Sequence, residues 1–309
     1  MELAELICDR FESVEQVRFT NSGTEANLMA IGTAVHVTGR RTVLVFEDGY
    51  HGGVLSFAHG VGPLNVPHDF LILPYNDVAA VEAVFAERGD TIACIVVEAV
   101  LGSGGCVPAE PAFLAALRRL CTEHATVLIF DEVMTSRLHP GGAQARFGVL
   151  PDMTTLGKYL AGGMTFGAFG GRRSIMAAFD PAQGGALSQA GTFNNNVVSM
   201  AAGVAALRDV LTPAALIALN DRGDQLRERL SVTLAGAGLP MTVSGVGSMM
   251  NVHAADDRWV ALFFHSMLAA GFYLARRGMI ALALDVTDAQ LDAFGVAVER
   301  WVGDPFGAG

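Results

Sequence analysis

Short apolar runs rich in β-branched residues alternate with amphipathic stretches along the first part of the chain. The runs Thr42–Phe46, Ile92–Val97 and Thr126–Phe130 are each bounded by turn residues or charges. Such runs are typical of strands that are buried on both faces of a parallel sheet. The stretches Ala79–Glu87 and Pro111–His124 lie between them and are predicted to be helices. The alternation predicts an α/β domain with a mainly parallel sheet flanked by helices.

The pattern changes near Leu211. A long amphipathic helix is predicted from Ala214 to Leu234, with leucines along one face. Shorter strand-like and helical segments follow it, at Met241–Val246, Met249–His253, Val260–Ala270 and Met279–Leu284. We therefore expect a large domain over residues 1–210 and a smaller C-terminal α+β domain over residues 211–309.

The composition limits the partners of this chain. Its 309 residues carry a formal net charge of −11, with 31 acidic and 20 basic residues. No basic surplus remains to neutralise phosphates, which argues against a nucleic-acid partner. The mean hydropathy of +0.41 is high. It indicates either burial against another subunit or a core that lacks part of its cover.

Neither the cysteines nor the apolar runs indicate a metal site or a membrane anchor. The four cysteines contain no C-x-x-C pair, so we expect buried free thiols, no disulfide and no metal ion. The N-terminus lacks the basic and apolar regions of a signal peptide, and no uninterrupted apolar run is long enough to span a membrane. We therefore expect a cytoplasmic protein without a membrane partner.

Two motifs carry polar groups at the ends of predicted elements. The segment Asn21–Asn27 places small residues and hydroxyls at a helix start, where free backbone N–H groups bind phosphate. A plain helix cap would look the same. Asp131 ends the buried strand that begins near Thr126, where ligands of open α/β sheets bind. A carboxylate there can pair with a cationic ring nitrogen or be a structural strand-end residue.

Lys158 is the only lysine of the chain, and it follows the segment Thr154-Thr155-Leu156-Gly157. An isolated lysine is usually a surface residue. The apolar, glycine-rich surroundings favour instead an amine that forms a Schiff base with a carbonyl compound. Tyr50 lies between glycines in Gly49-Tyr50-His51-Gly52. Its ring can stack on a flat cofactor, although a turn with a packed tyrosine fits this motif as well.

The order and spacing of these motifs resemble the class III aminotransferases of pyridoxal-phosphate (PLP) fold type I, in the glutamate-1-semialdehyde aminomutase-like group. The resemblance rests on the segments IFDEVMTSR, PDMTTLGKYLAGGMTFGAFGGR and AGTFNNNVVSMAAG. It is strongest with the β-phenylalanine (β-amino acid) aminotransferase branch, and it extends over nearly the whole chain. It implies a PLP-dependent enzyme that moves an amino group from an amine or β-amino acid to a keto acid.

The resemblance also implies roles for individual residues. Lys158 would hold PLP through a Schiff base and move the substrate's proton, and Asp131 would sit beside the pyridine nitrogen. The remaining cofactor contacts would come from Ser22, Gly23, Thr24, Tyr50, Glu98, Val133 and Thr192. In this family the threonine matching Thr192 reaches the phosphate of the neighbouring subunit, which implies a homodimer with shared active sites.

Substrate recognition is implied at Arg277. The β-amino acid branch has an Arg-Gly pair that binds a carboxylate, and Arg277-Gly278 matches it. A solvated surface arginine is the alternative.

The chain differs from the family pattern next to Glu98. The proline that usually follows the matching glutamate in this family is Ala99 here.

The chain departs from the family at its start, because Met1 lies almost directly before the phosphate motif. Family members carry an N-terminal segment that covers the active-site entrance. We therefore expect a wider site with weaker substrate discrimination. A glutamate-1-semialdehyde-type aminomutase, a PLP-dependent racemase and a truncated, non-catalytic PLP-binding chain are the alternatives to an aminotransferase.

Overall fold

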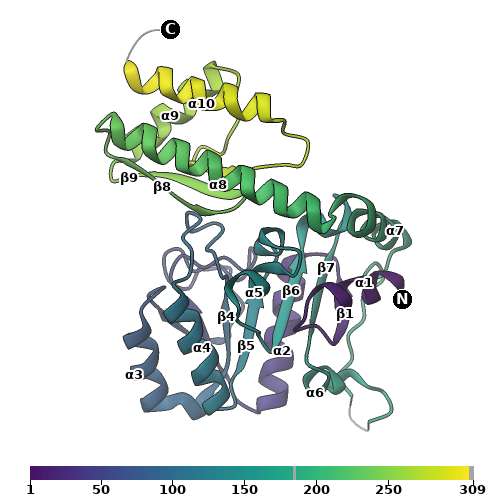
Figure 1. The fold of residues 1–309 in the computed structure, drawn as a ribbon. Coiled ribbons are helices and arrows are strands. Elements are labelled where there is room, and N and C mark those ends of the chain that lie inside the picture. The colour runs from purple at the N-terminus through teal and green to yellow at the C-terminus, as the bar shows by residue number, and fades with distance from the viewer. Residues whose placement is uncertain (184–185, 306–309) are drawn as a thin grey trace. The chain divides into compact units, whose positions relative to one another are not determined.

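The computed structural model describes residues 1–183 and 186–305. These residues form two compact units, drawn in Figure 1. The larger unit comprises Met1–Gly104 and Ala109–Thr212, and the smaller one comprises Gly105–Pro108 and Pro213–Gly309. The sequence predicts one boundary after residue 210, and no pattern in it indicates that Gly105–Pro108 belongs with the smaller unit. We propose that the two units are the two domains predicted from the sequence.

A seven-stranded sheet forms the centre of the larger unit, in the order β1-β7-β6-β5-β4-β2-β3 (Figure 1). Neighbouring strands from β3 to β6 pair in parallel, whereas β7 is antiparallel to both β6 and β1. The predicted mainly parallel sheet is confirmed. The strands span Gln16–Thr20 (β1), Thr42–Phe46 (β2), Asp69–Leu73 (β3), Ile92–Val97 (β4), Val127–Asp131 (β5), Met153–Gly157 (β6) and Gly167–Gly171 (β7).

Helices cover both faces of this sheet. Successive strand residues point to opposite faces. Leu44 therefore belongs to a buried cluster with residues of α3 and α4, and Val43 belongs to another with residues of α2. The helices of this unit are Glu2–Arg10 (α1), Gly23–Thr38 (α2), Val78–Arg88 (α3), Pro111–Glu123 (α4), Gly142–Phe147 (α5), Arg173–Met176 (α6) and Val197–Ala205 (α7). Shorter 3-10 and π-helical segments lie at Gly89–Thr91, Thr135–Leu138, Lys158–Ala161, Ala177–Phe179 and Ala206–Val210.

Strand β7 shows why some elements escape the hydrophobic pattern. Three of its five residues are glycines, which have low strand propensity. A Cβ atom at Gly167 would collide with the backbone oxygen of Ser22, and one at Gly171 would collide with that of Asp152. The close approach of neighbouring backbone therefore requires glycine at these positions, and this requirement overrides propensity.

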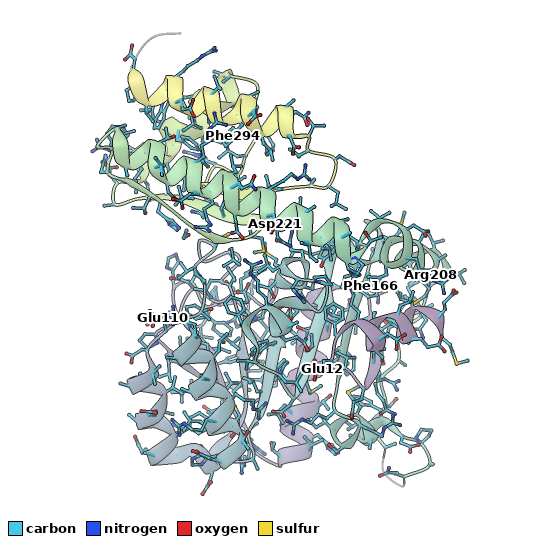
Figure 2. The ribbon with its side chains drawn as sticks, viewed as in Figure 1. Glu12, Glu110, Phe166, Arg208, Asp221 and Phe294 are labelled. Carbon is cyan, nitrogen blue, oxygen red and sulfur yellow. The ribbon has the colours of Figure 1, made fainter. Side chains whose placement is uncertain are left out.

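The smaller unit is an α+β arrangement around a three-stranded antiparallel sheet in the order β10-β9-β8. Phe294, labelled in Figure 2, belongs with Leu226 to its hydrophobic core. The elements are Pro213–Gly236 (α8), Met241–Val246 (β8), Met249–Ala254 (β9), Asp257–Ala269 (α9), Met279–Ala281 (β10) and Asp288–Gly303 (α10).

One predicted element is too long, because the strand expected over Met279–Leu284 ends at Ala281. The next residue, Leu282, donates its backbone N–H to Ser248, outside the ladder with β9. Its apolar side chain is buried in the core. The apolar residues after Ala281 therefore reflect burial in the core, which the prediction took for a continuation of the strand.

No single helix within residues 1–183 and 186–305 is both long and apolar enough to cross a membrane. One bent pair of consecutive helices, Val197–Val210 with Pro213–Gly236, reaches that length and composition only when the two are taken together.

Candidate active site

A cavity of about 240 Å³ lies where the parallel strands of the larger unit end. Parallel strands present their carboxyl ends at one edge of the sheet, so residues that follow different strands meet there. Seven residues predicted from the sequence line the cavity: Gly23, Thr24, Tyr50, Glu98, Asp131, Val133 and Lys158. Ser22 lies immediately before Gly23 as the cap of α2. Thr192 and Arg277 are not among the lining residues.

Lys158 directly follows β6 and begins a 3-10 turn. Its backbone has a φ of 51°, in the left-handed region that residues other than glycine rarely adopt. Such a conformation costs roughly 1–3 kcal/mol and persists where surrounding structure imposes it. The side chain is exposed and lines the cavity. The end of β6 therefore fixes the backbone position from which the side chain of Lys158 enters the cavity.

Asp131 is the last residue of β5, and its side chain is held from two sides. Its Oδ1 accepts the backbone N–H of Val133 at 3.0 Å. Its Oδ2 lies 2.8 Å from Asn27 Nδ2 and 2.8 Å from His51 Nδ1. Only 3% of Asp131 is exposed, so this carboxylate depends on these partners instead of water.

His51 is a buried partner of that carboxylate. Burial by itself lowers the pKa of His51, but the hydrogen bond to Asp131 and the charges of Asp131 and Glu98 raise it more. The net pKa of His51 lies above its ordinary value. The imidazole therefore carries its positive charge more readily than an exposed histidine does.

Glu98 follows β4 and holds two backbone amides with its two carboxylate oxygens. Oε1 accepts from Tyr50 at 3.1 Å, and Oε2 accepts from Gly102 at 2.9 Å. The pKa of Glu98 is raised from 4.5 to about 7, chiefly because the side chain is buried. The charge of Asp131 also raises this pKa, whereas the charge of His51 and the hydrogen bonds from Gly102 and Tyr50 lower it. Glu98 thus holds the loop that carries Tyr50 in place, and Tyr50 itself remains 43% exposed.

The raised pKa of Glu98 predicts a specific pH dependence of stability. Between pH 4.5 and about 7 the folded chain binds more protons at Glu98 than the unfolded chain does. Stability therefore falls as pH rises through this window, by up to roughly 3 kcal/mol from this group. The raised pKa of His51 acts in the same direction. In Glu98→Gln we expect a flatter pH slope of the unfolding free energy, measured by urea unfolding of cofactor-free protein from pH 5 to pH 8.

The control for this experiment is Glu123→Gln, which changes a half-exposed carboxylate on α4. It should leave the slope as in the parent chain, since surface ion pairs contribute little. An unchanged slope in Glu98→Gln would show that Glu98 stays ionised throughout the range.

The phosphate-binding prediction falls at the start of α2. Ser22 Oγ accepts the backbone N–H of Glu25 at 3.2 Å, so the serine does cap the helix. A Cβ atom at Gly23 would come within 2.8 Å of both methyl carbons of Val133. Glycine is therefore required for the helix start to lie against this wall of the cavity. The remaining N–H groups of the first turn are free to bind an anion by geometry.

Sequence reasoning missed five residues that line the cavity: Asn27, His51, Gly52, Ser103 and Met134. Asn27 and His51 belong to motifs that were singled out for other residues. An asparagine within an apolar helix is a signal of a buried polar contact, and Asn27 is 1% exposed. His51 follows Tyr50 in the motif Gly49-Tyr50-His51-Gly52, in which a role was predicted for Tyr50 alone.

Thr192 and Arg277 lie elsewhere. Thr192 precedes a segment in which Phe193, Val197 and Val198 are 66%, 81% and 63% exposed. Arg277 belongs to the smaller unit, where it lines a hollow of about 580 Å³ with Arg276, His253 and Asp257. Its Nη2 lies 3.0 Å from the sulfur of Met279.

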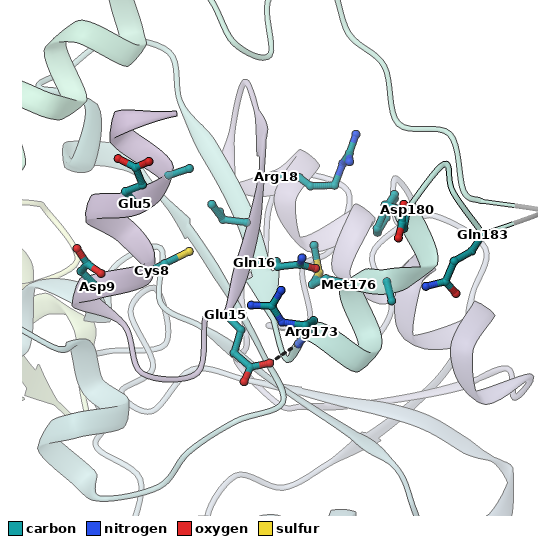
Figure 3. Close-up of a pocket in the computed structure, with 14 residues that line it drawn as sticks. Glu5, Cys8, Asp9, Glu15, Gln16, Arg18, Arg173, Met176, Asp180 and Gln183 are labelled. Carbon is teal, nitrogen blue, oxygen red and sulfur yellow. Dashed lines mark hydrogen bonds between the residues drawn. The ribbon is translucent and has the colours of Figure 1, made fainter.

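A larger hollow of about 800 Å³ lies between α1, β1 and α6 (Figure 3). Its charged lining residues are Glu5, Asp9, Glu15, Arg18, Arg173 and Asp180. None of the cofactor-binding or substrate-binding residues predicted from the sequence lines this hollow. Size therefore does not identify the candidate site, whereas the grouping of an amine, a buried carboxylate and a helix start does.

These groups fit PLP. The amine of Lys158 can form a Schiff base with the aldehyde of PLP, and the carboxylate of Asp131 can pair with the protonated ring nitrogen. The start of α2 at Gly23, with its free backbone N–H groups, can bind the phosphate of PLP. Tyr50 and Val133 supply an aromatic and an apolar wall.

Comparison with known proteins agrees with this fit. The family model for aminotransferase class-III matches residues 1–301. The chain is a class-III aminotransferase. It is 49% identical to the beta-phenylalanine transaminase of Variovorax paradoxus, in an alignment that covers 97% of this chain and 72% of that protein. The crystal structure of the V. paradoxus enzyme superposes with a TM-score of 0.95 at 48% identity, over 98% of this chain and 73% of the other.

Two further solved structures share the fold. A transaminase with PLP bound matches with a TM-score of 0.90 at 32% identity, over 98% of this chain and 77% of the other. A glutamate-1-semialdehyde aminomutase from Pseudomonas aeruginosa matches with a TM-score of 0.87 at 24% identity, over 98% and 75%. The predicted family, fold type and cofactor are confirmed, and this class-III aminotransferase is a PLP-dependent enzyme of amino-group transfer.

Proposed function

We propose that this aminotransferase takes the amino group of an aromatic β-amino acid and passes it to a keto acid, with Lys158 as the cofactor-binding lysine. The observation that carries the proposal is that Lys158, the only lysine of the chain, lines one cavity with Asp131. The substrate class is supported by the similarity to the beta-phenylalanine transaminase.

Different residues of the cavity would bind different parts of PLP. Asp131 would hold the ring nitrogen, and Val133 and Tyr50 would enclose the ring between them. Ser22, Gly23 and Thr24 would bind the phosphate at the start of α2. Glu98 would keep the Tyr50 loop in place through the hydrogen bonds described above. When bound, PLP supplies an electron sink for the substrate carbon that loses its proton.

Lys158 would have a second role, as a base, whenever its amine is not bound to PLP. Its freed amine is the base that removes the proton from the amine-bearing carbon, and later returns that proton to the cofactor side. Strand β6 ends directly before Lys158, so both roles would start from the same backbone position. The donor would leave as a ketone, and its amino group would pass to the keto acid acceptor.

A homodimer with shared active sites is part of the proposal. Thr192 would reach the phosphate in the partner subunit. Exposed apolar side chains next to it, those of Phe193, Val197 and Val198, are the kind that subunit interfaces bury. The cytoplasmic location stays a prediction from the sequence.

The test of the function is an assay with two substrates. Purified protein with PLP, β-phenylalanine and 2-oxoglutarate should yield the aromatic keto acid and glutamate in equal amounts. An isomer of β-phenylalanine with the amino group on another carbon, formed without the acceptor, would indicate an aminomutase, and inverted β-phenylalanine would indicate a racemase. If PLP binds but neither substrate changes, with other amines also inert, the non-catalytic alternative holds.

Arg277 supplies a prediction about the donor. In Arg277→Gln the KM for β-phenylalanine should rise about 10-fold to 100-fold with a smaller change in kcat. A charge-assisted pair with the substrate carboxylate is worth about 1.5–3 kcal/mol. The KM for 1-phenylethylamine, which has no carboxylate, should not change. Steady-state kinetics with both donors measures the difference.

The neighbouring arginine provides the control. Arg276 lines the same hollow and is also exposed, so Arg276→Gln changes the local charge equally. Equal effects of the two variants on the β-phenylalanine KM would contradict a specific role for Arg277.

A further inference from the structure

Both the nitrogen and the oxygen of the Asn27 side-chain amide form hydrogen bonds inside the candidate site. One Nδ2 hydrogen bond goes to Asp131 Oδ2 at 2.8 Å and another to the backbone oxygen of His51 at 2.9 Å. Its Oδ1 accepts from the hydroxyl of Thr155 at 2.7 Å. Asn27 and Thr155 are 1% and 0% exposed. The hydroxyl therefore fixes which way the amide points, and the amide fixes two groups at once.

The two oxygens of Asp131 are not equivalent. Oδ2 has two partners, since Asn27 Nδ2 and His51 Nδ1 both approach it. Oδ1 has the backbone N–H of Val133. A carboxylate oxygen can accept about two hydrogen bonds. Oδ2 is therefore filled by the protein, while Oδ1 keeps capacity for a further donor.

We infer that Asn27 is a positioning residue for the cofactor. It locks Asp131 and the His51 segment into one unit, and it presents Asp131 Oδ1 to the protonated ring nitrogen of PLP. The inference rests on the proposed role of Asp131. Asn27 acts through that carboxylate and has no part in proton transfer itself.

The charged and titratable groups around this unit come from several elements. His51 and Tyr50 follow β2, Glu98 follows β4 and Lys158 follows β6, and all four line the same cavity. On α2 itself, Glu25 is engaged by Asn21 at 3.0 Å. A carboxylate placed at position 27 would therefore face Asp131 directly, with His51 and Glu98 nearby.

Two substitutions separate positioning from mere packing. Asn27→Ala removes both donors, so the dissociation constant for PLP should rise at least about tenfold at every pH, as expected for losing a hydrogen bond to a charged group. Asn27→Asp keeps the shape. A protonated carboxyl at 27 can still donate to Asp131 Oδ2, whereas an ionised one repels it. Relative to the parent chain, its PLP affinity should be near normal at pH 5.5 and fall at least about tenfold by pH 8.5.

The measurement is a PLP titration followed by the Schiff-base absorption band, from pH 5.5 to pH 8.5, with thermal unfolding of each cofactor-free variant. Asn220→Ala is the matched control, because Asn220 is a 2% exposed asparagine in the smaller unit that bonds Leu216 and Ser248. It should lower the unfolding temperature without changing the PLP dissociation constant at any pH. If Asn27→Ala fails to fold, Asn27→Asp and Thr155→Val carry the test.

The outcomes distinguish this inference from the proposed function. PLP affinities of Asn27→Ala and Asn27→Asp that match the parent chain at every pH would overturn the inference and leave the function intact. Equal loss in Asn27→Asp at all pH values would also overturn it, because it would indicate packing alone. Absence of a Schiff-base band in the parent chain would instead remove the proposed function.

Discussion

Lys158→Ala should lose the Schiff-base absorption band and at least about a thousandfold of the transamination rate. The lysine is the covalent anchor in the proposed function and also the base that moves the substrate proton. Positioned general bases contribute about 10²- to 10⁴-fold by themselves. The unfolding temperature of the cofactor-free variant should not fall, since alanine loses no buried contact at this exposed position. Spectra with added PLP and single-turnover kinetics measure both effects.

The composition of the chain makes this prediction unusually direct to check. Lys158 is the only lysine of the 309 residues, so its ε-amine is the only lysine amine among them. Borohydride reduction in the presence of PLP should therefore label one peptide, the one that contains Lys158. Label confined to the N-terminus, or label that persists in Lys158→Ala, would show that the cofactor is not held by this residue. Lys158→Arg controls for charge, because it keeps the cation without an amine that can form a Schiff base.

The meeting of Lys158, Asp131 and Glu98 could be predicted from the sequence. Glu98 and Asp131 each follow a run whose apolar, β-branched composition marks a buried parallel strand. Lys158 follows the shorter, more polar segment Thr154-Thr155-Leu156-Gly157, and its place at a strand end was predicted from that motif. Parallel strands end at a common edge, so the three side chains had to converge once the strands were correctly placed. Strands β2 and β4 lie over the residues predicted for them, and β5 differs by one residue at each end.

The partners of Asp131 could not be predicted in this way. The bonds from Asn27 and His51 to Asp131 join residues 104 and 80 positions apart. No periodicity encodes such a contact, because it depends on how α2 and the loop after β2 pack over the sheet. A buried asparagine shows only that some partner exists. Strand β7 was missed for a different reason, since close backbone packing selects glycines that strand propensity disfavours.

Asp131→Asn should lower kcat by at least about a hundredfold while Lys158 still forms its Schiff base. The proposed role of Asp131 is to keep the ring nitrogen protonated, so that the ring can accept the electron pair of the substrate carbon. An uncharged amide cannot stabilise that proton. Its two ends also fail to match the site, because Oδ1 faces one N–H and Oδ2 faces two nitrogen donors. Single-turnover rates with β-phenylalanine measure the loss.

The control must separate two effects of Asp131→Asn, the loss of a negative charge beside the ring nitrogen and the loss of fold stability. Asp152 is a 4% exposed aspartate of the same unit, paired with Arg118 at 3.0 Å and Arg172 at 2.8 Å. It lies at the other end of β6 from Lys158, since it precedes Met153. Asp152→Asn should therefore reduce the unfolding temperature at least as much as Asp131→Asn and leave kcat nearly unchanged. If both variants lose activity only in proportion to their stability, Asp131 is a structural strand-end residue and the ring nitrogen is held by another group.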